Sequence, residues 1–350
     1  MKTQEKRSLL YGFLLGSVTI LMVAAWHLSL RPAASAAPKA LPRAVVIATH
    51  RVGTRFHADG SGIAKLVSER SPMTMVVRPH PGPPAWLPAM NTGEIEFGVI
   101  TGADAAAAYK GVGAYRKAFP NIRLLIIGAP LRVAFWARVD SGIRTVADLR
   151  GKRVPSGWSG LPVIHFNAGA NLATAGLTWD DVVRVPVAEL AEDLRAFLEG
   201  RTDVLWHSVG SPAVEEANAR IRGGVRLVAI GTAPEGLKRM GEINPGTYMT
   251  VVKKGSASAV LEDTPVQTND VYITTPVLLR ENVAYATVKV LWDYNKELVK
   301  ISPRLRPWTR GRMVSTEAAI PYHPGAIRFF REKGVWPAGM EALQQRLLQR

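Results

Sequence analysis

The chain has 350 residues, of which 47% are hydrophobic and 21% are charged, so it is long enough to bury a large core and to form two domains. It contains no cysteine, which excludes disulfides, thiol nucleophiles and zinc sites built from cysteine. The formal net charge of +16 raises the question of a nucleic-acid partner. The basic residues are dispersed, however, and no RNP, zinc-finger or basic-zipper pattern accompanies them, so we expect no nucleic-acid partner.

The N-terminus indicates export. Three basic residues among the first seven precede an uncharged run over residues 8–30, and Ala34 and Ala36 fit the small-residue positions of a cleavage site that leaves Ala37 as the mature start. The run is close to the roughly 20 residues that span a bilayer, so an uncleaved anchor is the alternative. We expect residues 1–36 to be a signal peptide or N-terminal anchor, and the folded body to be periplasmic, either free or tethered to the inner membrane.

From Ala44 onward, short β-branched runs alternate with helical patterns, which is typical of an α/β fold with a largely parallel sheet. We expect strands over residues 45–49, 73–78, 97–101 and 123–128. Between these strands we expect helices over residues 60–70, 85–92 and 104–110.

An extended segment over residues 132–139 indicates a crossover into a second series of elements, which starts at residues 145–150. The second series is expected to include residues 162–175, 189–200, 204–207, 212–221 and 225–230. Residues 272–278 then return the chain to the first lobe, where residues 283–301 are expected to form one long amphipathic helix.

Two crossings between two sheets predict a hinge between two lobes. Lobe I is expected to comprise residues 37–136 and 271–350, and lobe II residues 137–270.

The chain lacks the familiar catalytic signatures. Its nearest approach to a nucleophile elbow, at residues 156–160, fails the pattern G-x-S-x-G because Leu161 stands where the last glycine belongs. No H-E-x-x-H, P-loop or G-x-G-x-x-G pattern follows a predicted strand. The seven histidines are scattered, at positions 27, 50, 57, 80, 165, 207 and 323. We therefore expect no metal, no cofactor and no catalytic turnover.

One loop is the best candidate for ligand contact. It follows the predicted strand that ends at Val154 and precedes the predicted helix that begins near Pro162. Backbone N–H groups at a helix N-terminus carry partial positive charge and suit a carboxylate or similar anion. An ordinary strand-to-helix turn is the alternative. The loop residues are Ser156, Gly157, Trp158, Ser159 and Gly160.

Two stretches resemble signature stretches of the TAXI family of extracytoplasmic solute-binding proteins, the receptors of TRAP-type transporters. They are DSGIRTVADLRGKRV at residues 140–154 and PYHPGAIRFFREKG at residues 321–334. Residues 60–69 are similar to the first helix of the family, residues 92–98 to its A-G-E-A-D-L-G element, and residues 109–113 to its Y-N-G-T-G turn. The resemblance covers roughly residues 45–335 and implies an α/β, two-lobed periplasmic-binding-protein-like fold with two crossover strands forming a hinge.

The departures from the family pattern fall in its pocket loops. Residues 50–57 replace a Gly-rich loop that ends in a Tyr pair, residues 81–86 replace a G-G-S-x-E-N-like loop, and Thr101 with Gly102 replaces a Gln-Ser pair. This sequence thus resembles the family in its scaffold motifs but differs from it in the pocket loops. The combination indicates the same architecture with a different ligand. Arg51 and Arg55 are expected to supply charge to an anion, with solvent-facing arginines as the alternative.

The expected ligand contacts from these loops also include aromatic side chains, which predict an aromatic pocket wall. The predicted ligand-binding site therefore consists of the loop over residues 156–160 and eight further residues. These are Arg51, Thr54, Arg55, Phe56, His57, Trp86, Thr101 and Trp206.

The resemblance implies a monomeric receptor that captures a small organic anion, of carboxylate type, between its lobes and delivers it to the membrane subunits of a TRAP-type transporter. An anchored ligand-sensing ectodomain, or an enzyme that reuses the two-lobed fold, is the alternative, because fold alone does not decide function.

Overall fold

The computed structural model describes residues 40–52, 54–159 and 161–349. The predicted signal peptide or anchor therefore lies outside the described residues. Within those three ranges, none of the helices is long and apolar enough to cross a membrane.

The first described elements alternate as predicted, and three strands pair in parallel in the order β2-β1-β3. Their bounds are β1 Ala44–Thr49, α2 Arg55–Arg70, β2 Thr74–Pro79, α3 Leu87–Thr92, β3 Phe97–Thr101 and α4 Gly102–Lys110. Helix α2 begins five residues before the predicted start because the Thr54 hydroxyl caps it, accepting the His57 N–H at 3.2 Å.

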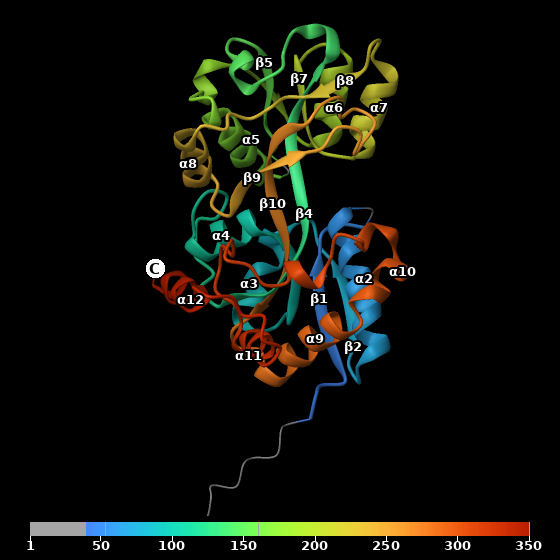
Figure 1. Cartoon of the computed structure of the whole chain (residues 1–350), viewed down its shortest axis with the longest axis vertical. Helices are drawn as coiled ribbons and strands as arrows, with labels where there is room; N and C mark the ends of the chain where they lie inside the picture. Colours follow the sequence, from blue (N-terminus) through green and yellow to red (C-terminus); the bar gives the residue numbers. More distant parts are fainter. Residues whose placement is uncertain (1–39, 53, 160, 350) are drawn as a thin grey trace, which may run out of the picture. The chain divides into compact units, whose positions relative to one another are not determined.

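Two long strands, β4 (Ile122–Arg138) and β10 (Thr264–Pro276), run antiparallel to each other over most of their length. They lie side by side in Figure 1. The predicted strand at residues 123–128 and the predicted crossover at residues 132–139 are thus parts of one continuous strand.

The expectation of a largely parallel sheet is wrong. Strand β10 inserts between β3 and β4 and pairs antiparallel with both, because the chain returns along β10 in the opposite direction. Further antiparallel pairs join β10 to β9 (Thr247–Val252) and β4 to β7 (Val204–Ser208) and β8 (Val225–Leu227). The result is a mixed eight-stranded sheet among the described residues.

The second series of elements carries a separate parallel pair, β5 (Arg153–Gly157) with β6 (Val183–Val187). Its helices are α5 Val163–Thr174, α6 Leu190–Leu198, α7 Pro212–Arg220 and α8 Pro234–Ile243.

The predicted helix over residues 283–301 is broken. Helix α9 spans Glu281–Asp293, a 3-10 turn spans Asn295–Glu297, and the short α10 spans Leu298–Ile301. The break has a physical cause: the Arg310 guanidinium donates to the backbone oxygens of Trp292 at 2.6 Å and Asp293 at 2.9 Å, replacing the next helical turn as their partner. Two more helices follow, α11 Pro324–Glu332 and α12 Met340–Leu348.

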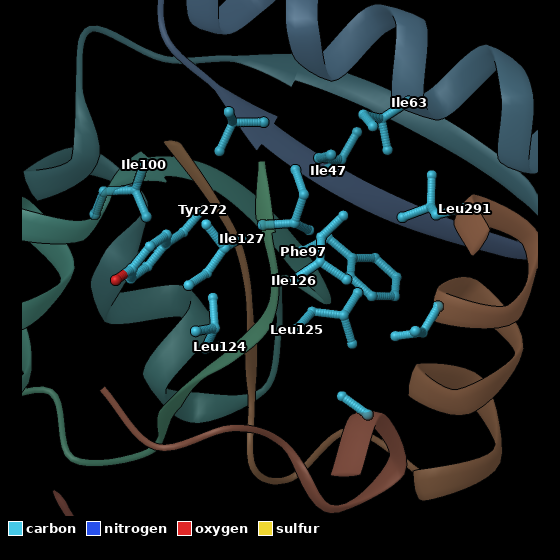
Figure 2. Packing of buried hydrophobic residues seen from close by; sticks show 14 of the residues in the cluster. Ile47, Ile63, Phe97, Ile100, Leu124, Leu125, Ile126, Ile127, Tyr272 and Leu291 are labelled. Carbon is cyan, nitrogen blue, oxygen red and sulfur yellow. The ribbon is translucent and has the colours of Figure 1, made fainter. Parts of the chain in front are cut away.

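Buried hydrophobic side chains form three clusters. The first, partly shown in Figure 2, draws on residues 45–129 and 271–343. The second and third draw on residues 133–240 and 134–266. Strand β4 passes from the first cluster to the other two between Ala129 and Val133, so it joins two lobes as predicted, and the α/β class is confirmed.

Three polar side chains, those of Asp270, Arg312 and Tyr248, form a polar clamp where the two long strands pass from one lobe to the other. Asp270 on β10 is buried and forms an ion pair with Arg312, whose Nε also donates to the Gly128 oxygen on β4 at 2.9 Å. The Tyr248 hydroxyl donates to the same carboxylate at 2.8 Å. Burial raises the pKa of Asp270, and the adjacent Arg312 opposes that rise. The register of β10 on β4 shifts directly after Asp270, so the clamp marks an irregularity of the ladder.

Gly128 gives a test of the packing at this crossing. A Cβ there would overlap the ring of Trp308, which is buried, whereas a Cβ at Gly241 in α8 would meet nothing within 4 Å. We expect Gly128→Ala to lower the free energy of unfolding by about 1–3 kcal/mol. The control Gly241→Ala should leave it unchanged or raise it by up to about 1 kcal/mol. Urea denaturation measures both, and equal stability of the two variants would contradict this packing.

Candidate ligand-binding site

The loop after β5 is shaped by a buried tryptophan. Gly157 has φ of 90°, and Trp158 has φ of 42°, the one positive φ of a non-glycine residue in the described part of the chain. The Trp158 N–H donates to the Val187 oxygen at 2.8 Å, and its indole is fully buried in the second cluster. A left-handed conformation at a bulky residue costs on the order of 1–3 kcal/mol, so packing of the indole holds the loop in this form.

The loop leads into α5, as predicted. Several backbone N–H groups at this junction, however, already donate to backbone oxygens of the same segment. The N–H groups of Leu161, Ile164 and His165 donate to backbone oxygens three residues earlier, at 2.8, 3.0 and 3.1 Å. Ser156 is buried and Ser159 is exposed, while Gly160 lies outside the described residues. Contact of this loop with an anion stays a prediction.

The three tryptophans expected to line a pocket lie in the hydrophobic cores. Trp86 packs beneath Gly98 in the first cluster, where a Cβ at that glycine would overlap the indole ring. Trp206 lies edge-on to Phe135 in the second cluster, with 4.8 Å between ring centroids, and Trp158 shares that cluster. All three are at most 2% exposed, so in this structure they are core side chains.

The predicted residues after β1 gather at the start of α2. The Phe56 ring stacks on His50 with 4.2 Å between centroids, and His57 Nδ1 lies 3.2 Å from the Thr49 hydroxyl. Arg55 lies 3.4 Å from the Asp59 carboxylate and donates to the Pro130 oxygen at 3.4 Å.

The other predicted residues of this loop lie closer to solvent. Arg51 is exposed, and its carbonyl oxygen accepts the Thr54 hydroxyl at 2.7 Å, which fixes the turn before the helix. The structure thus brings five of the predicted residues together, with Arg55 tied to the strand that joins the lobes.

A cavity of about 320 Å³ lies between α4 of the first lobe and α5 and α8 of the second. Its lining residues are Asp104, Ala107, Lys110, Val112, Gly113, Ala114, Val163, Phe166, Glu242, Ile243, Asn244 and Pro245. The first turn of α5 borders it, so the cavity adjoins the helix that follows the predicted loop. None of the residues predicted from the sequence is among those that line it.

The lobes approach each other closely at two glycines. A Cβ at Gly113, in the segment after α4, would lie 3.8 Å from the Phe166 ring on α5. A Cβ at Gly246, before β9, would lie 3.3 Å from the backbone of Gly102 at the start of α4. Both glycines have positive φ, 63° and 82°. The backbone conformation and the limited space therefore both favour glycine at these positions.

Helix α5 is fixed to the crossing strand by buried amides. The side-chain oxygen of Asn167 accepts from Asn244 at 2.7 Å, from Gln267 at 2.9 Å and from Asn269 at 3.0 Å. Gln267 and Asn269 belong to β10, and Asn244 lines the cavity. The cavity wall and the strand that joins the lobes therefore form one hydrogen-bonded unit.

Asp104 is the buried ionisable group of the cavity. The Thr101 hydroxyl caps α4 by accepting the Asp104 N–H at 3.0 Å, and Oδ1 of Asp104 accepts the Tyr115 hydroxyl at 2.9 Å. Only 4% of Asp104 is exposed, and burial raises its pKa to about 6 although the bond from Tyr115 opposes the rise. The sequence signal, Thr-x-x-Asp before an Ala-rich run, indicates a helix cap but says nothing of a cavity.

The raised pKa gives Asp104 a pH signature. Because the folded state holds this proton more tightly than the unfolded chain, the stability it contributes is full below the unfolded pKa near 4 and is lost as the pH rises through about 6. We expect Asp104→Asn, which cannot ionise, to raise the free energy of unfolding by about 1–3 kcal/mol at pH 7.5 and to have little effect near pH 4. Chemical denaturation across this range measures it, with the exposed Asp140→Asn as a control that should show no such trend.

No group of three or more His, Asp or Glu residues is placed to hold a metal ion in residues 40–52, 54–159 and 161–349.

The chain belongs to the NMT1-like family, which it matches over residues 47–334. Three solved structures with a similar fold are a TctC solute-binding protein from Polaromonas, XAC2383 from Xanthomonas citri bound to chloride, and Rpa4515 from R. palustris with adipate. Their sequence identities are 13%, 13% and 16%, and their TM-scores 0.51, 0.51 and 0.50. The matches cover 88%, 88% and 87% of this chain and 94%, 99% and 98% of the others. At these identities they establish the two-lobed α/β fold alone.

Proposed function

We propose that this protein is an extracytoplasmic solute-binding receptor. The observation that carries the proposal is the cavity between α4 and α5, because it is walled by both lobes and adjoins the N-terminus of a helix. Two of the similar structures support the proposal, because one is a solute-binding protein and another holds adipate, a dicarboxylate.

Solute capture in this proposal works by closure of two lobes. Lobe I comprises residues 37–136 with 271–350, lobe II comprises residues 137–270, and β4 with β10 is the hinge between them. A solute held by both walls stabilises the closed form and shifts the population toward it. Gly113 faces the Phe166 ring and Gly246 faces the backbone of Gly102, with room for little more than a Cβ between them, and these are the surfaces that meet in closure.

The finer proposal is a TAXI-type receptor that binds an anionic solute in the periplasm and delivers it to TRAP transporter membrane subunits. The exposed Ser159 and the start of α5 supply hydroxyl and backbone donors for a carboxylate. Arg51 lies just before α2 on the first lobe, is exposed and adds positive charge, whereas Arg55 at the start of α2 is paired with the buried Asp59. Binding without turnover follows from the missing nucleophile, metal and cofactor patterns of the sequence.

Closure gives the first functional test. We expect the exported protein to retain a small organic solute, identifiable by mass spectrometry after denaturation. Adding that solute back to the stripped protein should raise Tm and reduce the radius of gyration measured by small-angle scattering, because it binds the compact form preferentially. A solute that raises Tm but leaves the radius unchanged would argue against closure. A solute chemically converted during incubation would argue for the enzyme alternative.

The loop before α5 gives the second test. We expect Ser159→Asp to weaken binding of the recovered anion at least tenfold, about 1.4 kcal/mol, because its carboxylate occupies the helix end and repels the guest. The matched variant Ser159→Ala should lose less, since backbone donors remain. Isothermal titration measures both, and parent-like affinity of Ser159→Asp would show that the loop is an ordinary turn.

A further inference from the structure

Buried aspartates of this protein differ in how their charge is balanced. Asp59, which is fully buried, has Arg55 at 3.4 Å, and Asp270 has Arg312 as its ion-pair partner. These two follow the usual rule that a carboxylate removed from water is paired with a cation.

The remaining two buried aspartates of the described residues, Asp193 and Asp104, have no such arginine. Asp193 lies among side chains of the second lobe, where the backbone N–H of Trp206 donates to its Oδ2 at 3.2 Å. Asp104 differs because it lines a cavity. A cation from solution can therefore reach Asp104 through this cavity.

The groups around Asp104 leave one oxygen unoccupied. Oδ1 accepts the Tyr115 hydroxyl, and among the described residues no donor reaches Oδ2. Two other charged residues line the cavity, Lys110 at the end of α4 and Glu242 at the end of α8. Lys110 is exposed and forms no ion pair with Asp104 within the described ranges, and Glu242, itself a carboxylate, lies 3.9 Å from Lys238. The raised pKa of Asp104 accordingly has burial as its cause, with no cation opposing it.

We propose that Asp104 is the counter-charge for a protonated amine on the bound solute. The inference rests on the proposed solute-binding function. It gives the solute two charged groups, an ammonium that faces α4 and the proposed carboxylate that faces the start of α5. An ammonium N–H would donate to Oδ2 in a charge-assisted hydrogen bond. The neighbouring Ala107, Val163 and Phe166 side chains present apolar surface for an alkyl or similar body.

The sign of the pH dependence separates this proposal from its opposite. A bound ammonium favours the ionised carboxylate and lowers the pKa of Asp104, so its affinity is full above about pH 6 and falls as the pH drops below that value. A carboxylate placed against Asp104 would instead require the protonated acid, and its affinity would rise as the pH drops. The two solutes therefore titrate in opposite directions.

Hexylammonium and hexanoate, which share an alkyl body and differ in charge, are suitable probes. We expect hexylammonium to bind the stripped full-length protein at pH 7.5 and to shift the NMR signals of residues around the cavity. Its affinity should fall about tenfold at pH 5, where roughly nine-tenths of a group of pKa 6 is protonated. Asp104→Asn should weaken hexylammonium at least tenfold at pH 7.5 and abolish this pH dependence, while Asp140→Asn should do neither.

Three results would overturn the proposal: hexylammonium that fails to bind, Asp104→Asn that binds hexylammonium like the parent, or Asp104→Asn that weakens hexanoate as much as hexylammonium. Loss of binding in Asp104→Asn through misfolding is detected separately, since this variant is expected to be the more stable one at pH 7.5. If the recovered solute closes the lobes of parent and Asp104→Asn with equal affinity, the receptor function stands and the role of Asp104 alone fails.

Discussion

The antiparallel pairing of β4 with β10 is the constraint on which both lobes depend. The two strands pair from Ile122 with Pro276 to Val133 with Gln267, so their ladder begins in one core and ends in another. Because adjacent strands hold a fixed spacing and register, the first lobe cannot shift against the second without bending this ribbon. The ladder has two register shifts, between Asp270 and Tyr272 and between Ile273 and Thr274, where its pairing is already irregular.

One helix of each lobe is tied to the same pair of strands. Arg55 at the start of α2 donates to the Pro130 oxygen on β4, and Asn167 of α5 accepts from Gln267 and Asn269 on β10. Arg312 bonds both strands at once. A group bound against α5 or α2 therefore acts on the crossing through direct hydrogen bonds, which is a physical route for coupling solute contact to lobe position.

The sequence predicts the local elements well where burial and propensity agree. The strands expected at residues 45–49 and 97–101 match β1 and β3 to within a residue, because short β-branched runs between turns have few alternatives. It fails where distant residues decide: the helix expected over residues 283–301 is interrupted by Arg310, which no local pattern reveals. The antiparallel insertion of β10 is likewise a matter of topology and leaves no periodic signal.

The site was harder to predict than the fold, for a related reason. Tryptophan is compatible with a pocket wall and with a core, and only three-dimensional packing puts Trp86, Trp158 and Trp206 in the hydrophobic clusters. Asp104 is compatible with an exposed helix cap, and only the approach of α5 and α8 makes it a cavity residue.

Two energetically unfavourable features stand on either side of α5. Trp158 holds a left-handed backbone conformation in the loop before the helix, and Asp104 is a buried carboxylate without an ion-pair partner that lines the cavity beside it. Each opposes folding, and the large hydrophobic clusters of both lobes offset them. Strained and desolvated groups tend to occur where a protein meets its ligand, because a preorganised site must hold its donors and charges before the ligand arrives. Trp158 packs in the core of the second lobe and Asp104 lines the cavity from the first lobe, so α5 lies next to one strained and one desolvated group.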